Sequence, residues 1–304
     1  MILSLGEALI DLIHGPDGAE PRAQVGGSPF NVSIALSRME IEAGFLCPIS
    51  EDAYGEMLAS SLESNGVELC VKTRTSEPTA IAEVRTDAAG HPSYVFHREG
   101  TADRALAKYP PAEALPRKIE ALHFGSLVLA QEQDWPAWKE AIVRAKERGA
   151  FIAFDPNLRV LLIDDLDRYR ERLVEAVALA DLIKASDEDL SLLVPGCDPE
   201  EQIQSWCSPE RLVVLTQGSL GARLWARDGE VLFAPAEAGA QIVDTVGAGD
   251  TFQAAILAWL SHHSGFNRSL EAAEAEELLA FANRAALLNC TKAGCQPPTL
   301  KEIS

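Results

Sequence analysis

The stretch DTVGAGDTF, residues 244–252, places two glycines and two aspartates between two segments of different character. The preceding AQIV, residues 240–243, is short, apolar and β-branched at its end, which predicts a strand. The following QAAILAWLSHH, residues 253–263, has apolar residues at helical spacing, which predicts a helix. Glycines at a helix start let backbone N–H groups approach a bound anion, and the helix dipole favours negative charge there. The sequence therefore predicts an anion-binding turn between a strand and a helix.

Asp250 lies in the first turn of this predicted helix, where its carboxylate would repel a resting phosphate. That position suits a general base that accepts the proton of an attacking hydroxyl while a phosphoryl group is transferred. The N–H groups of Gly247, Ala248 and Gly249 would then stabilise charge on the migrating group. An ordinary helix-start aspartate after a glycine turn is the alternative, and the local sequence leaves both interpretations open.

Other nucleotide-binding motifs are missing from the sequence. The chain contains no Gly-Lys dipeptide and therefore no Walker A loop. GAGDTF lacks the third glycine of the dinucleotide fingerprint, and the protein-kinase set of motifs is absent. These observations disfavour a P-loop enzyme, a standard dehydrogenase and a protein kinase.

Charge and composition exclude further classes of protein. The net charge of −20, from 26 basic and 46 acidic residues, disfavours nucleic acid or an anionic membrane as a partner. The six cysteines form no CxxC pair, which favours reduced thiols in the cytosol. The N-terminal MILSLGEALIDLI is too short and too acidic for a signal peptide, and no apolar run reaches the roughly 18 residues of a membrane span. We expect a cytoplasmic protein with small-molecule ligands.

Strands and helices alternate from about residue 120 onward, which predicts an α/β fold. The predicted strands are 119–129, 150–154, 180–186 and 211–218, and the predicted helices are 134–149 and 164–180. We expect a doubly wound, mostly parallel sheet flanked by helices. Such sheets bind ligands at the C-terminal ends of their strands. Polar stretches follow the predicted strands there, with the sequences DPNLR, KASDED, TQGSLG and DTVGAGD.

The first third of the chain has a different pattern. Residues 72–106 contain alternating strand-like stretches around the turn DAAG, residues 87–90, which is typical of a hairpin. We interpret residues 10–31 and 72–106 as a small β-sheet lid inserted into the α/β core. The sequence shows no repeat, low-complexity stretch or long linker, so we expect one domain over residues 1–304.

Two of these stretches resemble the signatures of one family. DTVGAGDTF resembles the C-terminal signature of the ribokinase (PfkB) family of carbohydrate kinases, and GGSPFNVSIALSRM, residues 26–39, resembles its N-terminal signature. The resemblance covers essentially the whole chain. It implies a ribokinase-like fold with a small β-sheet lid, and transfer of a phosphoryl group from ATP, with Mg²⁺, to a small hydroxylated substrate. A homodimer is compatible with it.

The resemblance also implies roles for individual residues around the sugar. Asp250 matches the catalytic base, and Gly247, Ala248 and Gly249 match the anion hole. The residues that match the family's sugar contacts are Gly26, Gly27, Asn31 and Asp11. A carboxylate such as that of Asp11 can accept hydrogen bonds from two neighbouring hydroxyls. Outside the family context, the two glycines would indicate only a turn.

Two further stretches point to a subfamily. YVFHREGTAD resembles the lid segment of bacterial fructokinases, which implies Arg98 over the sugar and Asp103 beside it, although those enzymes often have tyrosine in place of His97. DPNLR matches the fructokinase and ketodeoxygluconate-kinase branch. The match implies that Arg159 reaches the phosphates as a planar cation and that Asp155 and Asn157 lie near the substrate. A strand-ending turn is the alternative for DPN.

The nucleotide and metal residues follow from the same resemblance. KASDEDL occupies the place of the family's Asn-x-x-Glu motif, so Asp189 would organise Mg²⁺ through water, with one methylene less than glutamate. Asp244 would help to hold a monovalent cation such as K⁺, as in some family members. The expected nucleotide-binding residues are Lys184, Thr216, Gly218, Gly221 and Asn283. Among the histidines, His123, His262 and His263 are expected to pack rather than to bind a metal.

The function expected from the sequence is that of an ATP-dependent fructokinase. A kinase for 2-keto-3-deoxygluconate or another sugar is the alternative within the same family. A non-catalytic binding protein that responds to sugar or nucleotide is the alternative from another class, against which the presence of Asp250 argues.

Overall fold

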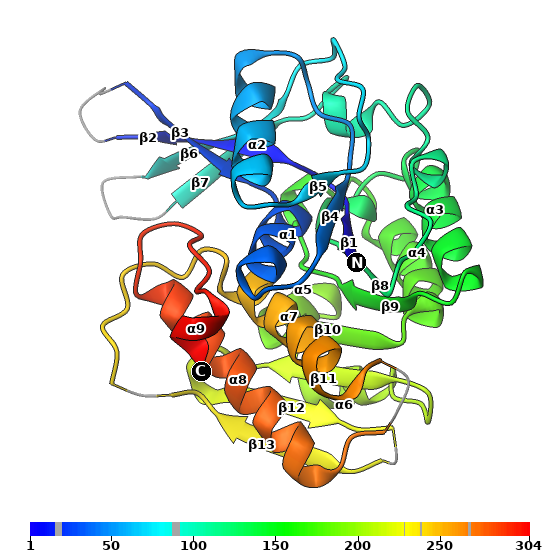
Figure 1. Cartoon of the computed structure of the whole chain (residues 1–304), viewed down its shortest axis with the longest axis vertical. Coiled ribbons are helices and arrows are strands. Elements are labelled where there is room, and N and C mark those ends of the chain that lie inside the picture. The colour runs from blue at the N-terminus through cyan, green and yellow to red at the C-terminus, as the bar shows by residue number, and fades with distance from the viewer. Residues whose placement is uncertain (16–19, 87–91, 228, 238, 267–268) are drawn as a thin grey trace.

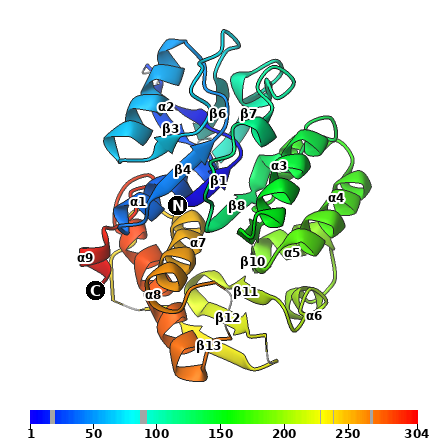
Figure 2. The same cartoon turned by 45° about the vertical axis from the view of Figure 1, so that its right-hand side comes forward.

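The larger of two β-sheets forms the centre of the fold, with helices on both faces (Figures 1 and 2). The computed structural model describes residues 1–15, 20–86, 92–227, 229–237, 239–266 and 269–304. Within these ranges the sheet has the order β13-β12-β11-β10-β9-β8-β1-β4-β5. Neighbouring strands from β11 to β5 in this order pair in parallel, whereas β12 pairs antiparallel with both β11 and β13 at one edge. The predicted doubly wound, mostly parallel α/β sheet is confirmed.

The strands of this sheet are β1 (Ile2–Leu5), β4 (Ala43–Leu46), β5 (Glu68–Leu69), β8 (Ala121–Gly125), β9 (Phe151–Asp155), β10 (Leu182–Ser186), β11 (Leu212–Thr216), β12 (Gly221–Trp225) and β13 (Val231–Pro235). The helices are α1 (Ser28–Arg38), α2 (Ala53–Ser64), α3 (Trp135–Glu147), α4 (Leu166–Leu179), α5 (Asp187–Leu193), α6 (Pro199–Gln204), α7 (Ala248–Trp259), α8 (Ala272–Cys290) and α9 (Leu300–Ile303). Figure 2 shows α1, α7 and α8 on one face of the sheet and α3, α4 and α5 on the other. None of the helices in the described ranges is long and apolar enough to cross a membrane.

Burial on both faces explains why the central strands are apolar along their whole length. β8 and β9 are buried at every position. The rings of Phe124 and Phe154 stack between them with centroids 4.8 Å apart. The polar residue Asp155 comes at the carboxyl end of β9, where the apolar run stops. The core thus brings polar side chains to one edge of the sheet.

The smaller sheet has the order β3-β2-β6-β7 and lies beside this edge (Figure 1). Its strands are β2 (Leu9–His14), β3 (Arg22–Gly26), β6 (Ala80–Thr86) and β7 (Pro92–His97). They come from the two segments interpreted as a lid, although segment 10–31 also runs into α1 and β2 begins one residue earlier. The turn at residues 87–90 lies outside the described residues. Because β2 pairs in parallel with β6, the two segments form a single sheet.

The prediction of a strand at residues 240–243 is wrong. These residues form no strand, and the side chains of Ile242 and Val243 are 52% and 57% exposed. The Val243 N–H instead donates to the Cys290 carbonyl at the end of α8, at 2.8 Å. The sheet already ends at β13, so the β-branched residues of this stretch have no strand to pair with, and tertiary context overrides their propensity.

Gly55 gives a test of the packing beneath the small sheet. It lies in α2, where alanine would normally stabilise a helix by about 1 kcal/mol relative to glycine. A Cβ at this position would instead overlap the Ser50 carbonyl. We therefore expect Gly55→Ala to lower the free energy of unfolding by about 1–3 kcal/mol. The exposed Ser60→Ala in the same helix is the control, and its stability should change little. Melting temperatures of both variants measure this, and a Gly55→Ala protein that melts no lower than wild type would contradict the close approach.

Candidate active site

A cavity of about 780 Å³ lies between the carboxyl edge of the large sheet and the small sheet. The small sheet contributes residues of β2, β3, β6 and β7, and the large sheet contributes the loop after β9 and the start of α7. Ligands of open α/β sheets bind at this edge, outside the carboxyl ends of the strands. The predicted site residues that line the cavity are Asp11, Gly27, Asn31, Asn157, Arg159, Asp244, Gly247, Gly249 and Asp250.

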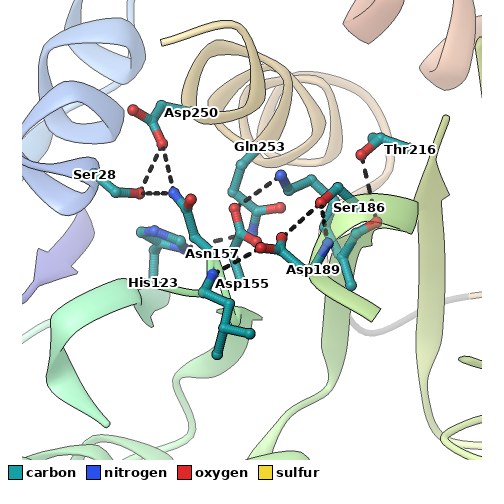
Figure 3. Close-up of polar contacts among 12 residues, drawn as sticks. Ser28, His123, Asp155, Asn157, Ser186, Asp189, Thr216, Asp250 and Gln253 are labelled. Carbon is teal, nitrogen blue, oxygen red and sulfur yellow. Dashed lines mark hydrogen bonds and ion pairs between the residues drawn. The ribbon is translucent and has the colours of Figure 1, made fainter. Parts of the chain in front are cut away.

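Asp250 is buried in the first turn of α7, and side chains from two other elements hold its carboxylate (Figure 3). The Ser28 hydroxyl donates to Oδ1 at 2.7 Å and the Asn31 amide donates to Oδ2 at 2.8 Å. The Asn157 amide donates to Oδ1 at 3.2 Å and to the Ser28 hydroxyl at 2.8 Å. Three donors therefore fix the orientation of a carboxylate at the cavity wall.

The glycine turn before Asp250 leaves the N-terminus of α7 open. Gly247 has φ of 75°, and a Cβ on it would overlap Cys295, so both the backbone conformation and the packing require glycine. Among the described residues, no side chain caps α7. The first N–H groups of a helix have no acceptor within the helix, and they favour an anion. The Ala248 N–H donates to the Thr245 carbonyl at 3.2 Å, and anion binding by this turn stays a prediction.

A buried ion pair lies directly beneath this turn. Lys184 Nζ lies 2.8 Å from Asp155 Oδ2, and it would be 3.2 Å from a Cβ placed on Gly249. Burial raises the pKa of Asp155 to about 6, even though Lys184 acts to lower it. Burial acts to lower the pKa of Lys184, but the carboxylates of Asp155, Asp189 and Asp250 together outweigh it and raise the pKa of the ammonium group. Lys184 therefore stays charged and adds positive potential behind the anion-binding turn.

The loop after β9 joins both sides of the cavity. Asn157 has the unusual φ of 38°, and its Oδ1 accepts from Arg159 Nη1 at 2.6 Å. Burial raises the pKa of Asp11 to about 6, and the nearby guanidinium of Arg159 acts to lower it. Arg159 thus lies near the Asp11 carboxylate on one side and the Asn157 amide that holds Asp250 on the other.

Asp189 supports this loop rather than lining the cavity. Its Oδ1 accepts from the Leu158 N–H at 2.8 Å, and its Oδ2 accepts from the Ser186 hydroxyl at 2.7 Å (Figure 3). Glu188, one residue earlier, does line the cavity, and sequence reasoning missed it. The described residues contain no group of three or more side chains that could hold a metal ion. A Mg²⁺ ion in this cavity would therefore be bound mainly by nucleotide phosphates and water, which is the usual form of a Mg²⁺ site.

Arg98 and Asp103 lie behind the cavity wall. They form a buried ion pair, with Arg98 Nε 2.6 Å from Asp103 Oδ2, and neither lines the cavity. Gly26 packs against the Asp11 carboxylate, and a Cβ there would lie 2.5 Å from Asp11 Oδ2. Glu7 does line the cavity, although sequence reasoning assigned it no role.

The expected nucleotide residues beyond Lys184 lie away from the cavity around Asp250. Thr216 donates to the Ala185 carbonyl at 3.4 Å at the end of β11 (Figure 3). Gly218 lies in the turn after it, and a Cβ on Gly221 would overlap the backbone of β13. Asn283 donates to the Ala234 and Pro235 carbonyls at 3.2 Å, which ties α8 to β13. Their nucleotide contacts stay predictions.

Asp244 connects the glycine turn to the C-terminal segment. Its Oδ1 accepts from the Val246 N–H at 3.0 Å, and its Oδ2 accepts from the Gly294 N–H at 2.8 Å. His123 lies buried beneath Lys184, where burial and the lysine charge lower its pKa to about 3. His262 and His263 contact backbone carbonyls. The histidines thus pack, and binding of a monovalent cation by Asp244 stays a prediction.

Known proteins are similar to this chain over nearly its whole length. The model of the pfkB family carbohydrate kinases matches residues 1–302. A fructokinase from Rhizobium leguminosarum bv. trifolii is 36% identical over 266 residues, which cover 86% of this chain and 79% of that protein.

Two solved structures are similar in fold and length. The structure of fructokinase with bound ATP from Xylella fastidiosa has a TM-score of 0.88 and 26% identity, covering 99% of this chain and 96% of that one. A fructokinase double mutant from Vibrio cholerae O395, with fructose, ADP and potassium ion bound, has a TM-score of 0.82 and 26% identity, with the same coverage of 99% and 96%. With the family match over residues 1–302, this chain belongs to the pfkB family of carbohydrate kinases.

Proposed function

We propose that this chain is an ATP-dependent fructokinase that transfers the γ-phosphoryl group of ATP to a hydroxyl of D-fructose. The observation that carries the proposal is the buried carboxylate of Asp250, fixed at the wall of the cavity beside an open helix N-terminus. Similarity to fructokinases from Rhizobium leguminosarum bv. trifolii and Xylella fastidiosa supports the choice of sugar.

Asp250 would act as the general base. A carboxylate has about four lone-pair positions, so it can accept from a sugar hydroxyl in addition to its donors in the chain. As the sugar oxygen attacks the γ-phosphorus, its proton moves to Asp250 and the bond from that phosphorus to the bridging oxygen of ADP breaks. Ser28, Asn31 and Asn157 keep the carboxylate in one orientation for that transfer.

Positive charge on two sides of the cavity would stabilise the migrating group. The N–H groups at the start of α7 and the buried Lys184 lie on one side, and the exposed Arg159 lies on the other. Mg²⁺ bound to the nucleotide would supply further neutralising charge. Asp189 would contact its water shell, and Asp244 would contribute to a monovalent-cation site. These groups together would stabilise the spreading negative charge of phosphoryl transfer.

The small sheet supplies the sugar-binding wall. Asp11 on β2 would accept hydrogen bonds from two sugar hydroxyls. Ile13, Val84 and Phe96 form an apolar surface on the same side of the cavity. Closing this surface over the sugar would exclude water and thereby limit hydrolysis of ATP.

A keto sugar acid is the second candidate substrate. Arg22 and Arg159 both line the cavity, and a guanidinium can bind a carboxylate through two parallel hydrogen bonds. A kinase for 2-keto-3-deoxygluconate would use such a cation.

The substrate prediction is tested with a panel of D-fructose, ribose, adenosine and 2-keto-3-deoxygluconate. We expect D-fructose to give the highest kcat/KM, measured by coupled release of ADP. A clear preference for the sugar acid would favour the second candidate, and a preference for adenosine would exclude both. No phosphorylation of any member would favour the non-catalytic binding protein.

The base is tested by Asp250→Asn, which keeps the size of the side chain but cannot take the proton. Loss of a general base should lower kcat by about 10²–10⁴-fold. Asp165→Asn is the matched control, because Asp165 caps α4 through the N–H groups of Asp167 and Arg168 at 3.0 and 3.1 Å. Asparagine is an equally good cap, so the control should keep its kcat and melting temperature. An Asp250→Asn enzyme with wild-type kcat would end the proposed mechanism.

Closure of the small sheet predicts a change in amide hydrogen exchange. Saturating D-fructose should slow exchange in β6 and β7, whose residues Val84 and Phe96 line the cavity. The buried central strands β8 and β9 serve as the internal control and should exchange at the same rate with and without sugar. Unchanged exchange in β6 and β7 at saturating sugar would contradict closure.

A further inference from the structure

Glu7 is a buried acidic residue that the mechanism above does not use. It follows β1 at the carboxyl edge of the large sheet and is only 2% exposed. It lines the same cavity as Asp250. Burying a carboxylate costs free energy unless hydrogen bonds or opposite charges compensate. Its contacts therefore indicate what it does.

The first contact is with the N-terminus of α1. That helix begins at Ser28 after Gly27, which has no side chain to cap it, and its first turn contains no acidic residue. Glu7 Oε1 accepts from the Ser28 N–H at 3.1 Å across 21 residues of sequence. A carboxylate at this place satisfies a free N–H group and interacts favourably with the helix dipole. Glu7 thus caps α1 from a distant part of the chain.

The capped turn is the one that holds the catalytic carboxylate. Ser28 and Asn31 lie in the first turn of α1 and donate to the two different oxygens of Asp250, at 2.7 and 2.8 Å. Only Ser28 separates Glu7 from Asp250 in this chain of contacts. A shift of the first turn of α1 would therefore move two of the three donors to Asp250.

A nearby positive charge also acts on Glu7. Arg98 directly follows β7, and it is ion-paired through Nε with Asp103. Burial raises the pKa of Glu7 to about 7, although the guanidinium of Arg98 acts to lower it. Within the described part of the chain, Glu7 Oε2 and Arg98 Nη1 are both buried without a hydrogen-bond partner. Glu7 is therefore also under the electrostatic influence of a buried cation that lies behind the cavity wall.

The raised pKa of Glu7 indicates how its ionisation affects the stability of the folded protein. A carboxyl group whose pKa is higher in the folded state destabilises that state as the pH rises from its ordinary value of 4.5 through about 7. The ionised form of Glu7 is therefore unfavourable for stability above this range. The hydrogen bond from Glu7 to the N-terminus of α1 is the contribution that the variants below examine.

We propose that Glu7 is a positioning residue: by capping α1 it holds Ser28 and Asn31, and through them Asp250, in the orientation needed for proton transfer. The inference rests on the proposed function, because it assumes that Asp250 is the base. It assigns Glu7 a role that needs no contact with the sugar or the nucleotide.

Two variants separate the contact from the charge. Glu7→Gln keeps an oxygen that can accept from the Ser28 N–H, and Glu7→Ala removes it. We expect Glu7→Ala to lower kcat by about tenfold, as the loss of one such contact is worth about 1 kcal/mol or somewhat more. The KM for ATP should stay within about twofold, and Glu7→Gln should restore kcat to within about threefold of wild type. At pH 8, Glu7→Gln should melt no lower than wild type, because it removes an unfavourable buried charge.

A double-mutant cycle then tests whether Glu7 acts through Asp250. In the Asp250→Asn background no proton is taken up, so adding Glu7→Ala should change kcat by less than about twofold. Asp165→Ala, which removes the local cap of α4, is the control for loss of a cap alone. It should lower the melting temperature and leave kcat unchanged. If Glu7→Ala does not fold, Glu7→Asp replaces it, since it withdraws the carboxylate by one methylene and should lower kcat similarly.

The outcomes distinguish this inference from the proposed function. A folded Glu7→Ala or Glu7→Asp enzyme with wild-type kcat overturns the role of Glu7, while an inactive Asp250→Asn enzyme keeps the proposed function. If Glu7→Ala lowers kcat by the same factor in the wild-type and the Asp250→Asn enzymes, the role of Glu7 is also overturned, because Glu7 would then act independently of Asp250. Wild-type activity of Asp250→Asn overturns both.

Discussion

The arrangement of the site depends on one carboxylate that is buried at the N-terminus of a helix. In the proposed mechanism, Asp250 has to be held in one orientation next to a turn that would receive a phosphate group. Hydrogen bonds from Ser28, Asn31 and Asn157 meet this requirement, and they come from α1 and from the loop after β9. The packing of α1 on α7 and the pairing of β8 with β9 therefore determine the geometry of the site. They bring these donors to within hydrogen-bond distance of one side chain.

More carboxylates than guanidinium groups line the cavity. Burial raises the pKa values of Glu7 and Asp11, which line it, and of Asp155 beneath the glycine turn, to about 7, 6 and 6, which means that the folded protein is less stable with these groups ionised. Such a cost is typical of residues that are kept for function rather than for stability. Ligands that bring positive charge into the cavity should therefore bind and stabilise the fold together.

Sequence patterns identified the parts of the site that are encoded locally. The glycine turn before α7, the place of Asp250 in its first turn and the strands β8 to β11 depend on neighbouring residues, and the structure has them where they were expected. Ser28 was missed because its contact with Asp250 spans 222 residues. Glu7 was missed for the same reason, and Arg98 lies behind the wall because Asp103, five residues later, pairs with it. The strand expected at 240–243 is absent because β13 already forms the edge of the sheet. A local sequence pattern carries no information on which sheet edges are already paired or which side chains already have a partner.

The parallel pairing of β2 with β6 has a consequence for how this fold assembles and diversifies. β2 lies in residues 9–14 and β6 in residues 80–86, with α1, β4, α2 and β5 between them in the chain. The small sheet is therefore not encoded by one continuous segment of the chain. No single deletion can remove it alone, and no single recombination event can exchange it for another sheet. During synthesis on the ribosome it cannot close until β6 has emerged, after the first strands of the large sheet. Sugar preference in this fold should therefore change through point substitutions on β2, β3, β6 and β7 rather than by replacement of the sheet as a unit.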